Sequence, residues 1–294
     1  MNWKTMFLII IVMSMVIIIG CGDNPVNTIT TAEKVGDYER WDDYVQIKQD
    51  YVSQKYSTVI EKGPEFVHHY QETQEPEVDE IQYLIADSLF QLKRYDKAIN
   101  EYRNLLENFP NSKYAPLSEL GIGNCYMISS KYSFDEAISK YKEFLTDYPD
   151  NSYAALAQLN IGKSLYFMAS DEIEFTDTVN NDGAIEELKK VLSKYQLALN
   201  NNIRREAELY IGKCYEEKPI PDYNMAILYY LEFASNNNDN NAGDIFYKIG
   251  YLYQTKFTGD EEAEAKAKEY YYTVINHFPY CSKYNEALNA YNQL

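Results

Sequence analysis

The chain has 294 residues, and 46% of them are hydrophobic, which is enough to build a large core. Its formal net charge of -18 argues against nucleic-acid binding, because phosphates select for Lys and Arg, and against electrostatic adsorption to anionic lipid. The 30 tyrosines suit half-buried helix faces and interaction surfaces, since each combines an apolar ring with a polar hydroxyl.

Residues 1–20 have the pattern of a signal peptide. Lys4 supplies a positive charge, and residues 6–19 are apolar apart from Ser14, a run shorter than a membrane-spanning helix needs. The run ends in the sequence IIGC, which resembles the lipobox of bacterial lipoproteins, with Cys21 as its cysteine. The resemblance implies cleavage before Cys21 and acylation of that residue, which gives stable membrane anchoring. The alternatives are an uncleaved membrane anchor and an ordinary signal followed by an unrelated cysteine.

Residues 21–40 are predicted to form a lipidated flexible tether. The segment from Gly22 to about Arg40 is polar and contains Pro25 and three threonines. A flexible chain of roughly 20 residues has a root-mean-square reach of about 25 Å, so the folded part is expected to lie close to its membrane.

The rest of the chain repeats a pair of helices. In the second helix of each pair a small residue recurs, at Ala98, Ala137, Ala184, Ala226 and Ala267. In the first helix a small residue precedes a large one by three positions, in the pairs Ala86–Leu89, Gly123–Tyr126, Gly162–Leu165, Gly212–Tyr215 and Gly250–Tyr253. Two helices approach closely only where a side chain is small, and the bulky neighbour then fills the adjacent space. This repeated pairing predicts stacked helical hairpins.

Prolines 110, 149 and 279 each follow an aromatic residue and are expected to end the second helix of a hairpin. After each proline comes a polar residue that is predicted to cap the next helix, namely Ser112, Asn151 and Ser282.

The pattern resembles the tetratricopeptide repeat. The resemblance implies an all-α fold, a right-handed superhelical solenoid of helical hairpins, over residues 79–294. The expected repeats are residues 79–112, 114–151, 153–196, 202–238 and 243–280, with a C-terminal capping helix at 282–293. Residues 41–76 are predicted to be a degenerate first hairpin or a cap, because Ile47 stands where a small residue belongs and Gly63 replaces an aromatic one. The long turns look like those of the bacterial envelope branch, which includes BamD-type lipoproteins of outer-membrane β-barrel assembly and Tol-Pal-associated proteins.

The sequence offers little catalytic chemistry. The adjacent histidines His68 and His69 point to different faces of a helix and, with His277, are interpreted as surface residues. Cys125 and Cys214 occupy similar helix positions and are predicted to pack as small hydrophobic residues. The sequence contains no Gly-rich phosphate loop, nucleophile elbow or metal-ligand spacing. We therefore predict that the protein is not an enzyme and has no metal site and no cofactor.

The first helices of tetratricopeptide proteins line a concave groove, so the resemblance implies that function lies there. Lys163 and Lys213, with Asn124, are expected to form a positive stripe that meets a carboxylate or an acidic peptide. The alternative is a solvated groove with scattered charges. The predicted partner-binding residues are Tyr83, Asp87, Phe90, Asn124, Met127, Lys163, Tyr166, Lys213, Glu216, Tyr247 and Tyr251.

Together these features predict a non-catalytic, membrane-tethered scaffold that binds other envelope proteins or peptides and no nucleic acid. The expected place is the bacterial cell envelope, lipid-anchored in the outer membrane and facing the periplasm, as part of an outer-membrane protein assembly complex. Two alternatives remain open: an adaptor lipoprotein for pilus, secretin or peptidoglycan machinery, and a lipoprotein that binds a solute or glycan.

Overall fold

The structure is a computed structural model, and it describes residues 31–70, 76–171, 178–195, 201–235 and 239–294. The chain divides into two compact units, residues 1–43 and 44–294. The described residues form thirteen α-helices and no strand. The helices are α2 (Thr31–Val52), α3 (Tyr56–Tyr70), α4 (Pro76–Gln91), α5 (Tyr95–Asn108), α6 (Ala115–Ile128), α7 (Phe134–Asp147), α8 (Ala154–Asp171), α9 (Thr178–Lys194), α10 (Asn201–Glu217), α11 (Tyr223–Ser235), α12 (Asn240–Lys256), α13 (Glu261–His277) and α14 (Tyr284–Tyr291).

The signal segment and Cys21 lie outside the described residues, as does the first half of the predicted tether. The second half of the tether differs from the prediction, because α2 begins at Thr31. Residues 31–40 read TAEKVGDYER, and alanine, glutamate, lysine and arginine all favour helix. Among the described helices, none has the length and apolarity needed to cross a bilayer.

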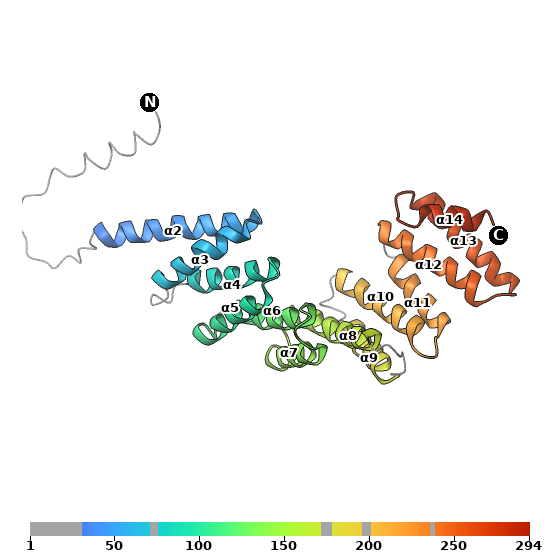
Figure 1. The fold of residues 1–294 in the computed structure, drawn as a ribbon, viewed down its shortest axis with the longest axis horizontal. Helices are drawn as coiled ribbons and strands as arrows, with labels where there is room; N and C mark the ends of the chain where they lie inside the picture. The colour runs from blue at the N-terminus through green and yellow to red at the C-terminus, as the bar shows by residue number, and fades with distance from the viewer. Residues whose placement is uncertain (1–30, 71–75, 172–177, 196–200, 236–238) are drawn as a thin grey trace, which may run out of the picture. The chain divides into compact units, whose positions relative to one another are not determined.

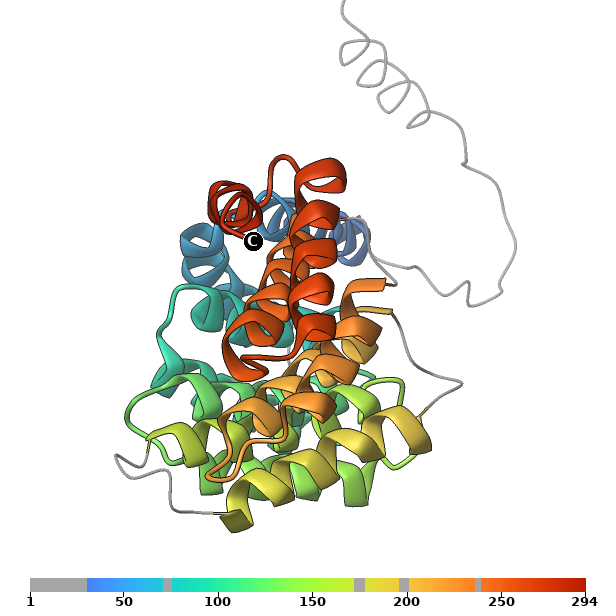
Figure 2. The same cartoon turned by 90° about the vertical axis from the view of Figure 1, so that its right-hand side faces the viewer.

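In the second unit, consecutive helices pack against each other all the way from α3 to α14. The first helices of neighbouring hairpins also touch, α4 with α6, α8 with α10, and α12 with α14. Figures 1 and 2 show this succession of hairpins in two views. The predicted all-α solenoid of helical hairpins is therefore confirmed.

The small residues of the hairpins are contact points, as their spacing predicted. All five alanines of the second helices are fully buried, namely Ala98, Ala137, Ala184, Ala226 and Ala267. A Cβ atom on Gly123 of α6 would lie 2.6 Å from the ring of Tyr141 in α7. A Cβ atom on Gly212 would lie 2.6 Å from the ring of Tyr230, and one on Gly250 would lie 2.8 Å from the ring of Tyr271. A side chain at these glycines would push the paired helices apart.

The predicted helix caps are wrong for Ser112 and Ser282. Helix α6 begins at Ala115 with Tyr114 at the N-cap position, and α14 has Lys283 there, without a side-chain cap in either case. The Ser112 hydroxyl instead donates to Asp79 of α4 at 2.5 Å, and the Ser282 hydroxyl donates to Asp244 of α12 at 2.9 Å. Both serines lie in a turn before the helix starts, so they tie the turn to the first helix of the preceding hairpin.

Candidate partner-binding groove

Several of the predicted groove residues accept hydrogen bonds from buried or half-buried tyrosines. Tyr102 of α5 and Tyr51 of α2 both donate to Asp87, with oxygen–oxygen distances of 3.3 and 2.6 Å. Tyr141 of α7 donates to Asn124 at 2.8 Å. A buried phenol needs an acceptor, because an unpaired hydroxyl in the core is costly. These polar residues of the first helices therefore complete the packing of the hairpins.

In two later hairpins a buried tyrosine of the second helix also donates to the first helix. Its acceptor there lies about one helical turn further along the first helix than Asp87 and Asn124 do. Tyr230 of α11 donates to Glu216 at 2.7 Å, and Tyr271 of α13 donates to Gln254 at 2.7 Å. Burial raises the pKa of Tyr230 and Tyr271 above the ordinary value for tyrosine. Their hydroxyls therefore remain protonated donors at neutral pH.

The two lysines of the predicted positive stripe meet at one tyrosine. The Nζ atoms of Lys163 and Lys213 lie 5.2 and 4.7 Å from the ring centroid of Tyr210. Lys163 also forms an ion pair with Glu206, with 2.7 Å between Nζ and Oε2. Asn124 is bound elsewhere, since its Oδ1 accepts from Tyr141 and from Asn160.

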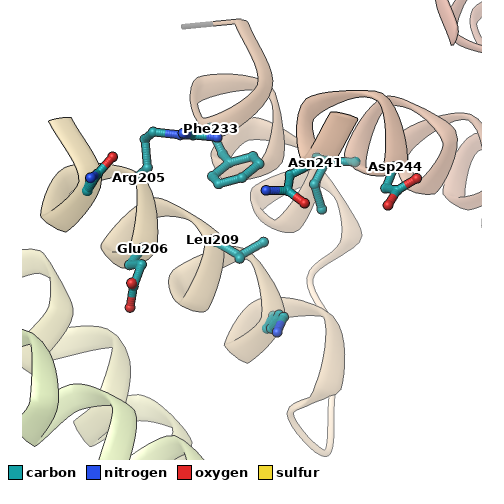
Figure 3. A pocket seen from close by; sticks show the side chains of 9 residues that line it. Arg205, Glu206, Leu209, Phe233, Asn241 and Asp244 are labelled. Atoms are coloured by element: carbon teal, nitrogen blue, oxygen red, sulfur yellow. The ribbon is translucent and has the colours of Figure 1, made fainter. Parts of the chain in front are cut away.

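A hollow of about 520 Å³ lies on α10, α11 and α12. Figure 3 shows the ring of Phe233 at its centre, between Arg205 and Asn241, with Leu209 below. The guanidinium of Arg205 lies 4.9 Å from the centroid of that ring. The floor is apolar and the rim is polar, and the whole lining comprises Asn202, Arg205, Glu206, Leu209, Lys213, Phe233, Asn241, Asp244 and Ile245.

A second hollow, of about 420 Å³, continues from the first. The two share Lys213, Asp244 and Ile245. The remaining lining of the second hollow is Glu216, Glu217, Tyr230, Tyr247, Lys248, Tyr251 and Lys283. We call the two hollows together the α10–α12 groove. It has the apolar floor and convergent polar groups of a binding site.

Comparison with known proteins supports the architecture. Residues 80–112 match the family model described as the tetratricopeptide repeat. The fold is that of the tetratricopeptide repeat. No curated protein matches the chain.

Similar solved structures include that of Pseudomonas aeruginosa pilF, which is 14% identical with a TM-score of 0.53, covering 85% of this chain and 99% of that one. YrrB, described as a TPR protein with an unusual peptide-binding site, is 20% identical with a TM-score of 0.47, covering 73% of this chain and 91% of that one. MamA is also 20% identical, with a TM-score of 0.46, covering 71% of this chain and 95% of that one.

Four of the predicted residues line the α10–α12 groove of this tetratricopeptide fold, namely Lys213, Glu216, Tyr247 and Tyr251. Other predicted residues take part in packing. Tyr83 stacks on Tyr114 with 5.2 Å between ring centroids, and the Tyr166 hydroxyl donates to Glu217. Phe90 packs edge-on against Tyr95, and Met127 lines a separate hollow of about 510 Å³.

Sequence reasoning missed part of the groove. Phe233 lies on α11, a second helix, and the family rule assigns the groove to first helices alone. Asn241 and Asp244 lie in the first turns of α12, well before Tyr251. The signal available in the sequence was a pair of polar residues, Asn241 and Asp244, directly before the apolar run Ile245–Tyr247.

The remaining reactive side chains fit the packing interpretation. His68, His69 and His277 are exposed. Cys125 and Cys214 are fully buried, as predicted for small core residues, and burial raises the pKa of the Cys125 thiol to about 12. Within the described ranges, no group of three His, Cys, Asp or Glu residues is placed to hold a metal ion.

Proposed function

We propose that this protein is a non-catalytic, lipid-anchored scaffold of the bacterial cell envelope that holds a segment of another envelope protein in the α10–α12 groove. The tetratricopeptide fold itself indicates a protein–protein interaction scaffold. The observation that carries the proposal is the pair of joined hollows, with an apolar floor of Leu209, Phe233 and Ile245 beneath a polar rim. Such a floor takes an apolar side chain of a partner, and the rim satisfies its polar groups.

The lipobox-like sequence before Cys21 supports the anchoring part of the proposal. Acyl chains on this residue would hold the repeats at the membrane surface. We place the protein at the outer membrane, facing the periplasm, where it serves an outer-membrane protein assembly complex. This assignment follows from the resemblance of the long aromatic-proline turns to those of envelope proteins.

Site-specific photocrosslinking in the source cells tests the groove. Benzoylphenylalanine at Leu209 or Ile245, both in the groove lining, is expected to yield one adduct, and mass spectrometry should identify an outer-membrane assembly component. The same probe at Leu228, a 48% exposed residue of α11 outside that lining, is the control. Equal adducts at groove and control positions would contradict the proposal. A pilus or secretin component in the adduct would replace the assembly role with the adaptor role.

The anchor has its own test. Cys21→Ser is expected to move the protein from the detergent-soluble membrane fraction to the soluble fraction. Cys281→Ser, which alters a buried cysteine of the folded unit, should leave the protein at the membrane. Integral attachment of the Cys21→Ser variant would mean that an uncleaved helix holds the chain.

A further inference from the structure

Within the residues that the structure describes, the α10–α12 groove contains one cation without an acidic partner. Among the charged residues of its lining, Arg205 pairs with Asp239 at 2.7 Å, and Lys283 pairs with Glu286 at 2.9 Å. The remaining ion pairs of the lining are Glu206 with Lys163 and Glu216 with Lys248. In the described part of the chain, Lys213 has no ion pair, and its amine lies over the rings of Tyr210 and Tyr166.

Two carboxylates of the lining are bound by neutral donors. Glu217 accepts from the Tyr166 hydroxyl, and Asp244 accepts from the Ser282 hydroxyl and the Lys283 backbone amide. These two carboxylates disfavour another negative charge in the parts of the groove that they face. Within the described residues, Lys213 is therefore the lining residue best suited to meet a carboxylate of a bound segment.

The exposed side-chain amides of Asn202 and Asn241 lie on the rim of the first hollow. Neither makes a side-chain hydrogen bond within the residues that the structure describes. Side-chain amides can both donate to and accept from a peptide main chain. An extended segment leaves its main-chain groups open to such contacts, whereas a helix pairs its own.

We propose that the groove selects an extended segment that places an apolar side chain on the Phe233 floor and a single internal acidic side chain at Lys213. The inference rests on the proposed function and names the class of its partner. The acid is internal, and not a chain terminus, because Lys213 belongs to both hollows and the groove continues on each side of it. A run of acidic residues is disfavoured by Asp244 and Glu217.

Fluorescence anisotropy with three peptide libraries tests the proposal. Each library holds fluorescein-labelled, C-terminally amidated nonapeptides with a central leucine, uncharged residues elsewhere, and Glu, Gln or Lys at one position that is moved along the peptide. The Glu library, with the acid at its best position, is expected to bind about 2- to 5-fold more tightly than the Gln library, as for a partly exposed ion pair. A second Glu beside the first should remove that gain.

The Lys213→Gln variant should bind the Glu and Gln libraries equally. Lys189→Gln is the matched control, because Lys189 also lies over tyrosine rings, at 5.4 Å from Tyr215, but is outside the groove lining. It should keep the preference for Glu, and thermal melts of both variants check that they fold.

Three results would overturn the inference. Binding of the Glu and Gln libraries with equal affinity by the unaltered protein leaves the peptide-binding function standing but removes the role of Lys213. Tightest binding of the Lys library would show selection of a basic segment by Asp244 and Glu217. Absence of binding by all three libraries would contradict the proposed function together with the inference.

Discussion

Replacing Gly123 by alanine tests the close contact between α6 and α7. A Cβ at this position would lie 2.6 Å from Cε1 and 2.9 Å from Cδ1 of Tyr141. The Tyr141 ring is fully buried, and its hydroxyl is held by Asn124, so the ring has little room to move. Overpacking of this kind costs about 1–3 kcal/mol, whereas alanine gains about 1 kcal/mol over glycine in a helix interior. The net change is a loss of about 0–2 kcal/mol.

Gly183 of α9 is the matched control. A Cβ there would have only the Cδ1 atom of Leu165 nearby, at 3.9 Å, which is an ordinary contact. Gly183→Ala therefore keeps the propensity gain of about 1 kcal/mol without the clash. Subtracting the two variants cancels the propensity term and leaves the overpacking cost of about 1–3 kcal/mol.

Thermal denaturation followed by circular dichroism measures both variants. For a folded unit of this size, 1 kcal/mol corresponds to a shift of about 2–4 °C in Tm. Gly183→Ala should melt above the parent protein, and Gly123→Ala should melt about 2–12 °C below Gly183→Ala. Equal stabilisation by both alanines would mean that α6 and α7 do not approach closely at Gly123, and the account of the repeat spacing would be wrong.

Three further predictions concern buried polar groups. Tyr141→Phe removes the donor to Asn124 and should lower the free energy of unfolding by about 1 kcal/mol in urea titrations, and an unchanged value would contradict a structural role for this hydrogen bond. Burial and the nearby carboxylate of Asp147 raise the pKa of Glu119. The stability that protonated Glu119 contributes is therefore lost as pH rises from the unfolded-state pKa of about 4.3 through the raised pKa of the folded state. In urea titrations, Glu119→Gln should be more stable than the parent protein at pH 7 and equal to it near pH 4. Because the pKa of the buried Cys125 thiol is about 12, its peptide should resist alkylation at pH 8 in native protein and react fully in urea, as mass spectrometry of the digest can show.

The hairpins could be predicted from sequence because their contacts recur along the chain. Ala98 and Gly123 recur at matching positions of successive hairpins, and the helix that each contacts is adjacent in the chain. The residues at which the helices begin were harder to predict from the sequence. Ser112 was predicted to cap α6, but its hydroxyl bonds to Asp79, a residue 33 positions earlier, and no local pattern reveals that partner.

The roles of the groove residues depended on partners in other helices. Asp87 has the position of a groove residue, yet Tyr51 and Tyr102 both donate to it, from residues 36 and 15 positions away. Lys163 and Lys213 looked equivalent by spacing. Only the structure distinguishes them, because Glu206 of α10 pairs with Lys163.

The acceptor of the buried tyrosine differs in position between the earlier and the later hairpins. In the two hairpins from α4 to α7, the buried tyrosine bonds to the residue directly after the small contact residue, Asp87 or Asn124. The side chain at that position of the first helix therefore serves as the acceptor for the buried tyrosine. In the hairpin of α8 and α9, Leu188 stands in place of the tyrosine and faces Gly162, so no hydroxyl needs an acceptor there.

In α10 and α12 the acceptor of the tyrosine lies one helical turn further along than in α4 and α6. Tyr230 bonds to Glu216, four residues after Gly212, and the position directly after the glycine is left to Lys213. Gln254 serves Tyr271 in the same way, which leaves the position after Gly250 to a tyrosine that lines the second hollow. A shift of one turn in a structural hydrogen bond thus leaves Lys213 without this packing role, as the proposed contact with a peptide requires.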